Sequence, residues 1–180
     1  AASLEIILMA DPYHNIISLR AVRHFDPAPI PDNILRHILQ AGRWTGSAKN
    51  TQPWHFVVVR ERGTLDALAG CGRYASHLRA APLAVAIVTA STRFWDTFDA
   101  GRAAQSMMLT AWAEGIGSCI AGLDAACARP VLGVPDDHHL QLAISFGYPQ
   151  ANAPHTIEGR PLDEVLAGLG RVPFDEIVHW

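Results

Sequence analysis

A cluster of amide and hydroxyl side chains lies in the run Thr45–Trp54, which reads Thr-Gly-Ser-Ala-Lys-Asn-Thr-Gln-Pro-Trp. Ser47, Asn50 and Gln52 can donate and accept hydrogen bonds, and ordering them costs side-chain entropy that no apolar burial offsets. The run leads into the β-branched segment His55–Val59, which is typical of a strand inside a sheet. A loop held at a strand entrance is suited to binding a polar, planar molecule, although the same residue types also make ordinary capping loops.

Three arginines are candidates for binding an anion. Arg20 and Arg23 lie three residues apart in the run Ser18–Phe25, and Arg171 follows Gly170 near the end of the chain. A guanidinium fork matches the oxygens of phosphate and carboxylate groups, and a short turn could present two forks in one direction. The alternative is that all three are solvated surface side chains.

Other motifs predict no chemistry. The segment Gly70–Ala75 matches the letters of the dinucleotide fingerprint, but it follows a helical pattern and not a strand, so the phosphate-binding geometry is missing. The chain has no P-loop and no G-x-S-x-G motif. His138 and His139 are adjacent, and neighbouring side chains on an extended segment point apart, so we expect no shared metal ion.

The three cysteines, Cys71, Cys119 and Cys127, form no C-x-x-C pair. We therefore predict neither a disulfide framework nor a structural zinc site, and we expect the cysteines to be small core residues. This usage is typical of a reducing cytoplasm.

The composition favours a single domain over residues 1–180 that buries surface against a partner. Hydrophobic residues make up 49% of the chain and charged residues only 17%, and the net charge is -3. Without a basic stripe, nucleic-acid binding is not expected. The apolar run Leu4–Met9 is too short for a signal peptide, and no run approaches the roughly 20 apolar residues of a membrane span. We expect a soluble protein that is not exported and does not bind a membrane.

Hydrophobic periodicity and Gly/Pro punctuation predict an α+β fold of three layers, with about four strands and helices on both faces of the sheet. Helices are expected over 12–18, 31–42, 94–114 and 124–132, with one or two short helices within 63–81. Strands are expected over 54–59, 83–89, 115–122 and 140–146.

Two further segments predict association with a second copy. The helix expected over 94–114 is apolar nearly all round and rich in alanine and glycine, which permits close approach of another helix. The tail 151–180 is rich in proline but carries Phe174, Ile177 and Trp180, which favours wrapping around a neighbour.

The order of these pieces resembles the nitroreductase family of flavin enzymes, from about residue 17 to the end of the chain. The matching segments are Ser18–Phe25, Pro29–Ile30, Gly46–Trp54, Asp99–Gln105, Gly115–Ser118, Ile120–Asp124, Gly133–Pro135, Ile144–Pro149 and Gly170–Trp180. The chain departs from the family at Leu19, Ala21 and Gly46, where the family often has arginine, serine and proline.

The resemblance implies a mostly antiparallel sheet and a homodimer with two FMN molecules at the subunit interface, the tail of each chain crossing to its partner. It implies that Arg20 and Arg171 hold the FMN phosphate and that Arg23 lies near the pyrimidine edge. The remaining residues implied to bind the cofactor are Ala21, Ser47, Asn50, Gln52, Cys119, Ile120, Ala121 and Gly122, with the backbone N–H groups of Ala121 and Gly122 near flavin N5.

The function implied is an FMN-dependent oxidoreductase in which NAD(P)H passes a hydride to N5 and then leaves. An electron-poor acceptor such as a nitroaromatic or a quinone takes its place, in a ping-pong scheme. No side chain is singled out as catalytic, because the flavin carries the chemistry. Two alternatives stay open: a relative that uses reduced FMN with oxygen for oxidation or flavin fragmentation, and a flavin-binding or sensory dimer with little turnover.

Overall fold

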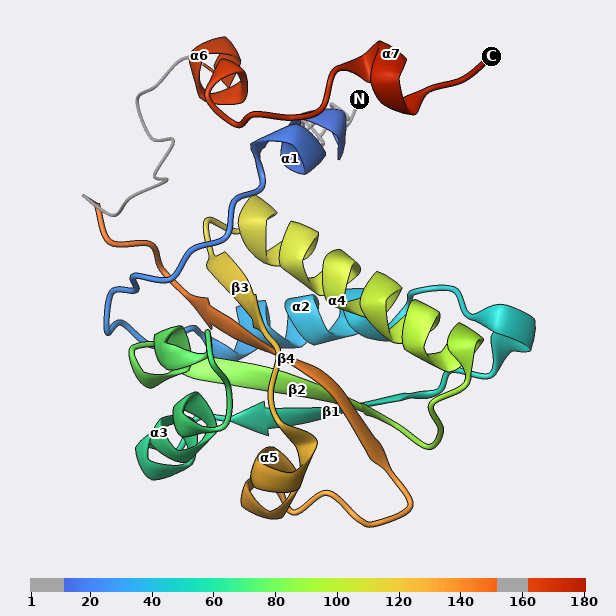
Figure 1. Cartoon of the computed structure of the whole chain (residues 1–180). Coiled ribbons are helices and arrows are strands. Elements are labelled where there is room, and N and C mark those ends of the chain that lie inside the picture. Colours follow the sequence, from blue (N-terminus) through green and yellow to red (C-terminus); the bar gives the residue numbers. More distant parts are fainter. Residues whose placement is uncertain (1–11, 152–161) are drawn as a thin grey trace, which may run out of the picture.

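Four strands form an antiparallel sheet, with β1 (Trp54–Val59) and β3 (Gly117–Ala121) at its edges and β2 (Leu83–Thr89) and β4 (His139–Gly147) between them (Figure 1). The computed structural model describes residues 12–151 and 162–180. The apolar run Leu4–Met9 lies outside these residues.

The centre of the sheet is buried because β2 is apolar from Leu83 to Val88. Every residue of β2 is buried, as the continuous run after Pro82 predicts for a strand covered on both faces. Its neighbour β4 is buried over its second half, from Ala143 to Gly147.

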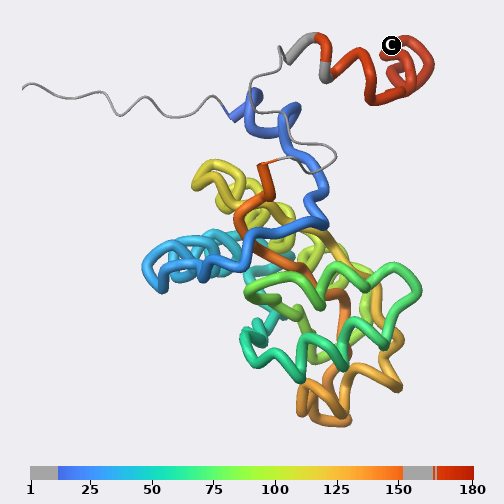
Figure 2. The backbone as a smooth tube through the Cα atoms, turned by 90° about the vertical axis from the view of Figure 1, so that its left-hand side faces the viewer, coloured from blue at the N-terminus to red at the C-terminus, as the bar shows by residue number. Residues whose placement is uncertain are grey.

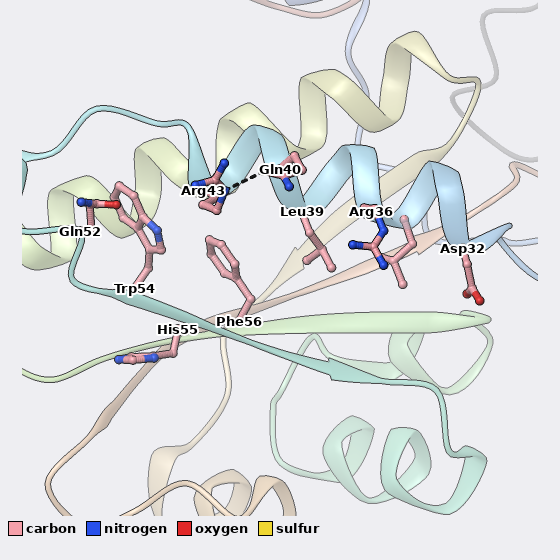
Figure 3. A pocket seen from close by; sticks show the side chains of 10 residues that line it. Asp32, Arg36, Leu39, Gln40, Arg43, Gln52, Trp54, His55 and Phe56 are labelled. Carbon is pink, nitrogen blue, oxygen red and sulfur yellow. Dashed lines mark hydrogen bonds between the residues drawn. The ribbon is translucent and has the colours of Figure 1, made fainter.

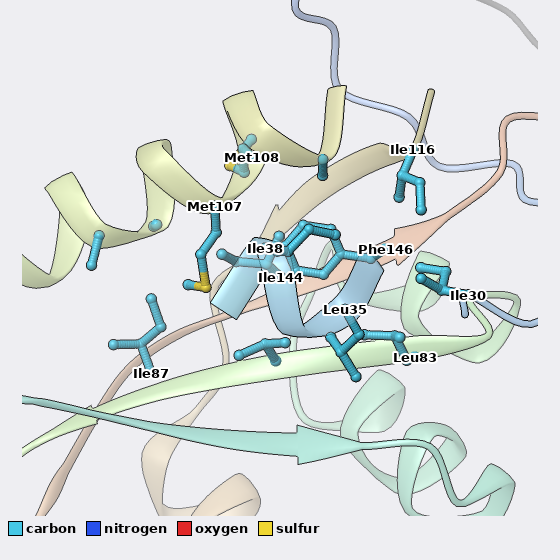
Figure 4. Close-up of a cluster of buried hydrophobic side chains, with 14 of the residues drawn as sticks. Ile30, Leu35, Ile38, Leu83, Ile87, Met107, Met108, Ile116, Ile144 and Phe146 are labelled. Carbon is cyan, nitrogen blue, oxygen red and sulfur yellow. The ribbon is translucent and has the colours of Figure 1, made fainter. Parts of the chain in front are cut away.

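One face of the sheet is covered by α2 (Asp32–Arg43) and α4 (Phe94–Ala113), which enclose the larger hydrophobic core (Figure 4). Leu35, Ile38 and Gly42 are the buried residues of α2, at the spacing of one helical face. The absence of a side chain at Gly42 brings the two helices together, since a Cβ there would lie 2.9 Å from Met107 Cγ.

The other face is covered by α3 (Arg62–Gly70), the short 3-10 helix η2 (Ser76–Arg79) and α5 (Ala125–Leu132). Glu61 caps α3 by accepting the N–H groups of Gly63 and Thr64, and Asp124 caps α5 by accepting the N–H of Cys127 at 2.9 Å. The two layers of helices around one sheet confirm the three-layer α+β fold, and the predicted helices and strands are confirmed to within a few residues.

The prediction for the cysteines is wrong in one respect. Cys71 and Cys127 form a disulfide that joins the C-terminal end of α3 to the first turn of α5. The two residues are 56 positions apart, and sequence spacing alone does not show that the helices bring them together. Cys119 is free and buried, as expected of a small core residue.

The first and the last two of the described helices lie beyond one end of the sheet. There α1 (Pro12–Ser18) lies against the end of α4, while α6 (Leu162–Ala167) and α7 (Phe174–Ile177) lie farther from the sheet (Figure 2). The indole N–H of Trp112 donates to Ser18 Oγ at 2.9 Å and ties the end of α1 to the last turns of α4. Phe174, Ile177 and Trp180 are largely exposed, so this segment presents apolar side chains that the described part of the chain does not cover.

Two kinds of feature are missing from the part of the chain that the structure describes. None of its helices combines the length and apolar character that crossing a membrane requires. No three of its His, Cys, Asp and Glu side chains are grouped so that they could hold a metal ion.

Candidate functional site

The segment from Arg20 to Arg23 lies along the outer edge of β3. Ala21 forms a parallel bridge with Ser118, and the N–H of Val22 donates to the Ser118 carbonyl at 2.9 Å. The segment therefore brings two of the predicted anion-binding arginines to the edge strand that carries Cys119–Gly122.

Arg20 is a buried cation with unused hydrogen-bond donors. It is 8% exposed, and its Nη1 donates to the carbonyl oxygens of Ile17 at 2.8 Å and Leu19 at 2.7 Å. Its Nε and Nη2 are buried and have no hydrogen-bond partner among the described residues. Burial, and secondly the charge of Arg171, lower the pKa of Arg20 from its ordinary value. A buried guanidinium with unpaired N–H donors, close to the charge of a second arginine, is suited to binding an anion such as a phosphate.

Along β3, the backbone N–H and C=O groups of successive residues point alternately toward β4 and toward the outer edge of the sheet. Cys119 and Ala121 pair with Ser145 and Ala143 of β4, whereas the carbonyl of Ser118 points outward to Val22. Because this direction alternates along an antiparallel strand, the N–H and C=O of Ile120 also point to the outer edge. Gly122 follows two residues later, where a glycine leaves room for a ligand to approach the backbone.

The sequence did not point to His77, which lies behind this edge of the sheet. His77 is 5% exposed, its Nδ1 is 2.9 Å from Ser145 Oγ, and its buried Nε2 has no hydrogen-bond partner among the described residues. Burial lowers the pKa of His77, the nearby charge of Arg23 lowers it further, and the Ile120 backbone acts in the opposite direction. A single histidine in a short helical segment carries no pattern from which its burial behind β3 could be predicted.

Cys119 lies beside the same group of residues. It is 3% exposed, and burial raises the pKa of its thiol while the charge of Arg23 acts the other way. A buried thiol of this kind is protonated at neutral pH, so it adds no nucleophile to the site.

Ser47, Asn50 and Gln52 form a second group, at the entrance to β1. Ser47 Oγ accepts the N–H of Gln52 at 2.9 Å, and the Gln52 side chain lies 3.4 Å from the carbonyl oxygen of Asn50. The loop includes a 3-10 turn, η1 (Ala48–Asn50), and Asn50 and Gln52 are exposed. These polar groups therefore face outward, where a ligand can reach them.

The two groups lie at opposite edges of the sheet. Asp99, near the start of α4, binds the loop through the N–H of Ala48, whereas Trp112, near the end of α4, binds Ser18. Thirteen residues of helix between Asp99 and Trp112 correspond to about 20 Å. One chain thus brings Arg20, Ala21, Arg23 and Cys119–Gly122 together, with Arg171 near Arg20. It does not bring to them the loop that contains Ser47, Asn50 and Gln52, called here the Ser47 loop.

A cleft of about 710 Å³ opens between α2 and β1 (Figure 3). Trp54 and Phe56 line its inner side, while Arg36 and Arg43 come from α2. Gln52 lies at one end of the cleft, and the remaining predicted cofactor-binding residues do not line it. The cleft is therefore separate from the anion site at Arg20.

Comparison with known proteins identifies relatives over most of the chain. A model of the nitroreductase family matches residues 16–71 and 66–148. A protein of Archaeoglobus fulgidus, provisionally named an NADH dehydrogenase/NAD(P)H nitroreductase, is 30% identical over 146 residues, which are 75% of this chain and 83% of that protein.

Solved structures show the same fold. The FMN-dependent nitroreductase of Clostridium difficile superposes with a TM-score of 0.74 at 26% identity, over 78% of this chain and 89% of that one. The NADPH:FMN oxidoreductase of Vibrio harveyi, solved with NAD+, superposes with a TM-score of 0.77 at 21% identity, over 94% of this chain and 76% of that one.

Proposed function

Since this chain belongs to the nitroreductase family of NAD(P)H-dependent oxidoreductases, we propose that it holds FMN and uses NAD(P)H to reduce a small electron-poor acceptor. FMN is the cofactor and NAD(P)H the co-substrate.

The observation that carries this proposal is the unpaired, buried guanidinium of Arg20 beside Arg171. The structure leaves two buried N–H donors of Arg20 without an acceptor, and leaving such donors unpaired is costly. A phosphate monoester supplies the missing acceptors and offsets the repulsion between Arg20 and Arg171. The FMN phosphate is such a group.

The flavin ring would then lie along the outer edge of β3. A Cβ on Gly122 would meet nothing within 4 Å, so this residue leaves open space for the ring, while the alternation of the strand turns the N–H of Ala121 toward β4. Arg23 places a positive charge at the same edge, which stabilises negative charge on a reduced ring. When bound, FMN supplies the chemistry, accepting a hydride from NAD(P)H and giving two electrons to the acceptor.

We infer that the site is completed by a second copy of the chain. Ser47, Asn50 and Gln52 lie at the opposite edge of the sheet from β3, so a loop from a partner chain is needed to bring these residue types to the flavin. Phe174 and Trp180 follow Arg171 and are exposed, which supports a homodimer in which the last residues of each chain pack against its partner while Arg171 stays beside Arg20 of its own chain. The α4 residue Gly101 is exposed, as the contact face of a shared helix pair requires.

The acceptor is a nitroaromatic or a quinone, and one pocket serves donor and acceptor in turn. The test is steady-state oxidation of NADH or NADPH by the FMN-loaded protein, with and without a quinone. We expect parallel lines in double-reciprocal plots, as a ping-pong scheme requires. Oxidation that does not respond to any quinone or nitroaromatic would contradict the assignment of the acceptor.

A further inference from the structure

We propose that Asp99 and Arg102 of α4 are positioning residues that hold the loop Gly46–Gln52 in the conformation that contacts FMN. This inference rests on the proposed function, because it concerns the loop that completes the flavin site. It assigns a role to two residues of the central helix that do not themselves touch the cofactor.

Asp99 and Arg102 hold the loop from two sides. Asp99 is 1% exposed, and its Oδ2 accepts the N–H of Ala48 at 2.7 Å. Arg102 Nη1 donates to the carbonyl oxygen of Gly46 at 2.8 Å and to Asp99 Oδ1 at 3.1 Å. The two side chains thus form one charge-assisted network with the backbone on either side of Ser47.

A third contact extends the network by one turn of α4. Thr45 Oγ1 donates to Ser106 Oγ at 2.8 Å, and Ser106 Oγ donates to the Arg102 carbonyl oxygen at 3.1 Å. The start of the loop is therefore bound to α4 at Asp99, Arg102 and Ser106, which occupy successive turns of one helical face.

The loop needs such support because its backbone is unusual. Lys49, Asn50 and Gln52 have φ angles of 53°, 58° and 47°. Residues other than glycine seldom adopt positive φ, and they keep it only where the surrounding structure enforces it. Two of the three are predicted to contact the cofactor, so the contacts with α4 hold functional residues in a conformation that the free loop would leave.

Gly46 explains why the network matters in this chain. The family often has proline at this position, and proline would restrict the loop by itself. Here the residue is glycine, and the carbonyl that it presents is held by Arg102. The hydrogen bond from Arg102 of α4 therefore restricts the backbone at Gly46, which a glycine by itself leaves free.

An ion pair elsewhere on α4 provides a matched control. Arg93 Nη2 lies 3.2 Å from Asp96 Oδ2, so an arginine again pairs with a buried aspartate three residues away. Asp96 also accepts a hydrogen bond from Ser91, and neither Arg93 nor Asp96 is hydrogen-bonded to the loop 46–52. Arg93→Met therefore removes a comparable surface ion pair while the loop stays bound.

The first test is hydrogen exchange of the FMN-free protein. In Arg102→Met and Asp99→Asn, we expect the amides of residues 46–52 to exchange about tenfold faster than in the wild type, with no change in β2. In Arg93→Met, the loop amides should exchange at the wild-type rate. Equal exchange in Arg102→Met and wild type would overturn the proposal without any reference to the cofactor.

The second test measures the dissociation constant for FMN. We expect Arg102→Met to raise it about tenfold and Arg93→Met to leave it within twofold of wild type. Adding Gly46→Ala to Arg102→Met should recover most of the loss, because an added Cβ restricts the backbone and would lie no closer than 3.4 Å to Arg102 in the intact protein. A purely structural role for Arg102 predicts no such recovery.

The outcomes separate the two proposals. Wild-type protein that binds FMN, together with Arg102→Met that binds it equally well, overturns the positioning role and leaves the flavin assignment standing. Wild-type protein that takes up no FMN overturns both.

Discussion

The side chain of Val22 fills the space in which a Cβ on Gly117 would lie. A Cβ built on Gly117 would be only 2.6 Å from Val22 Cβ and from Val22 Cγ2. Val22 is also hydrogen-bonded to Ser118, so this contact fixes how closely the segment carrying Arg20 and Arg23 approaches the edge of β3. The geometry of the anion site thus depends on a glycine that lies outside it.

We predict that Gly117→Ala displaces this segment from β3. The overpacking should lower the free energy of unfolding by about 1–3 kcal/mol and should weaken FMN retention, since Arg20 and Arg23 move together. Urea denaturation and flavin occupancy after gel filtration measure the two effects. Gly70→Ala is the control, because a Cβ at Gly70 meets nothing within 4 Å; equal behaviour of the two variants would contradict the prediction.

Breaking the disulfide should destabilise the protein. Cys71 and Cys127 close a loop of 56 residues, and a cross-link of this kind typically contributes about 2–4 kcal/mol, in part by restricting the unfolded chain. We expect a reductant to lower the urea midpoint of the wild type and to leave Cys127→Ser unchanged. A wild-type midpoint that is the same with and without reductant would show that the bond makes no such contribution.

The pH dependence of stability should carry a contribution from His77. The pKa of His77 is lowered in the folded protein, so between about pH 6.5 and that lower pKa the unfolded chain binds a proton that the folded chain does not. Stability is therefore lost as the pH falls through this window, with a slope of up to about 1.4 kcal/mol per pH unit.

His77→Gln should remove this contribution. We expect the free energy of unfolding of the variant to fall less steeply than that of the wild type between pH 7.5 and pH 5. Identical slopes would mean that His77 titrates alike in the folded and unfolded chains.

Local patterns predicted the elements of the fold well. The apolar run after Pro82 gave a fully buried central strand, and Asp124 caps its helix as its position before that helix indicates. These features depend on neighbouring residues and on the alternation of polar and apolar positions, both of which are readable from the chain.

Features that depend on tertiary packing were not predictable in the same way. The pairing of Cys71 with Cys127 depends on where α3 ends and α5 begins, and the position of His77 behind β3 depends on the path of the chain before β2. The separation of the Ser47 loop from Arg20 follows from the strand order, which local patterns do not specify. The motifs predict which residues take part in the candidate site, and the strand order of the sheet determines which of them one chain can bring together.

A shared site can be tested by mixing two defective chains. Arg171→Ala removes one phosphate ligand, and Asn50→Gly removes a loop side chain while tolerating the positive φ at this position. We expect each homodimer to bind FMN about tenfold more weakly than the wild type. A mixed dimer, isolated with two affinity tags, should regain one site of wild-type affinity, because its intact Arg171 and its intact loop meet at one of the two sites.

The opposite result has a clear meaning. If the mixed dimer binds FMN no better than either parent, both groups act within a single chain, and the loop does not reach the flavin of a partner.

The most direct measurement is a titration of FMN-free protein with FMN, followed by visible absorbance and by gel filtration. We expect a yellow protein that retains one FMN per chain and whose flavin band bleaches when NADH or NADPH is added without oxygen. Protein that stays colourless and takes up no FMN would contradict the account at its centre, because the buried, unpaired donors of Arg20 would then serve some other anion.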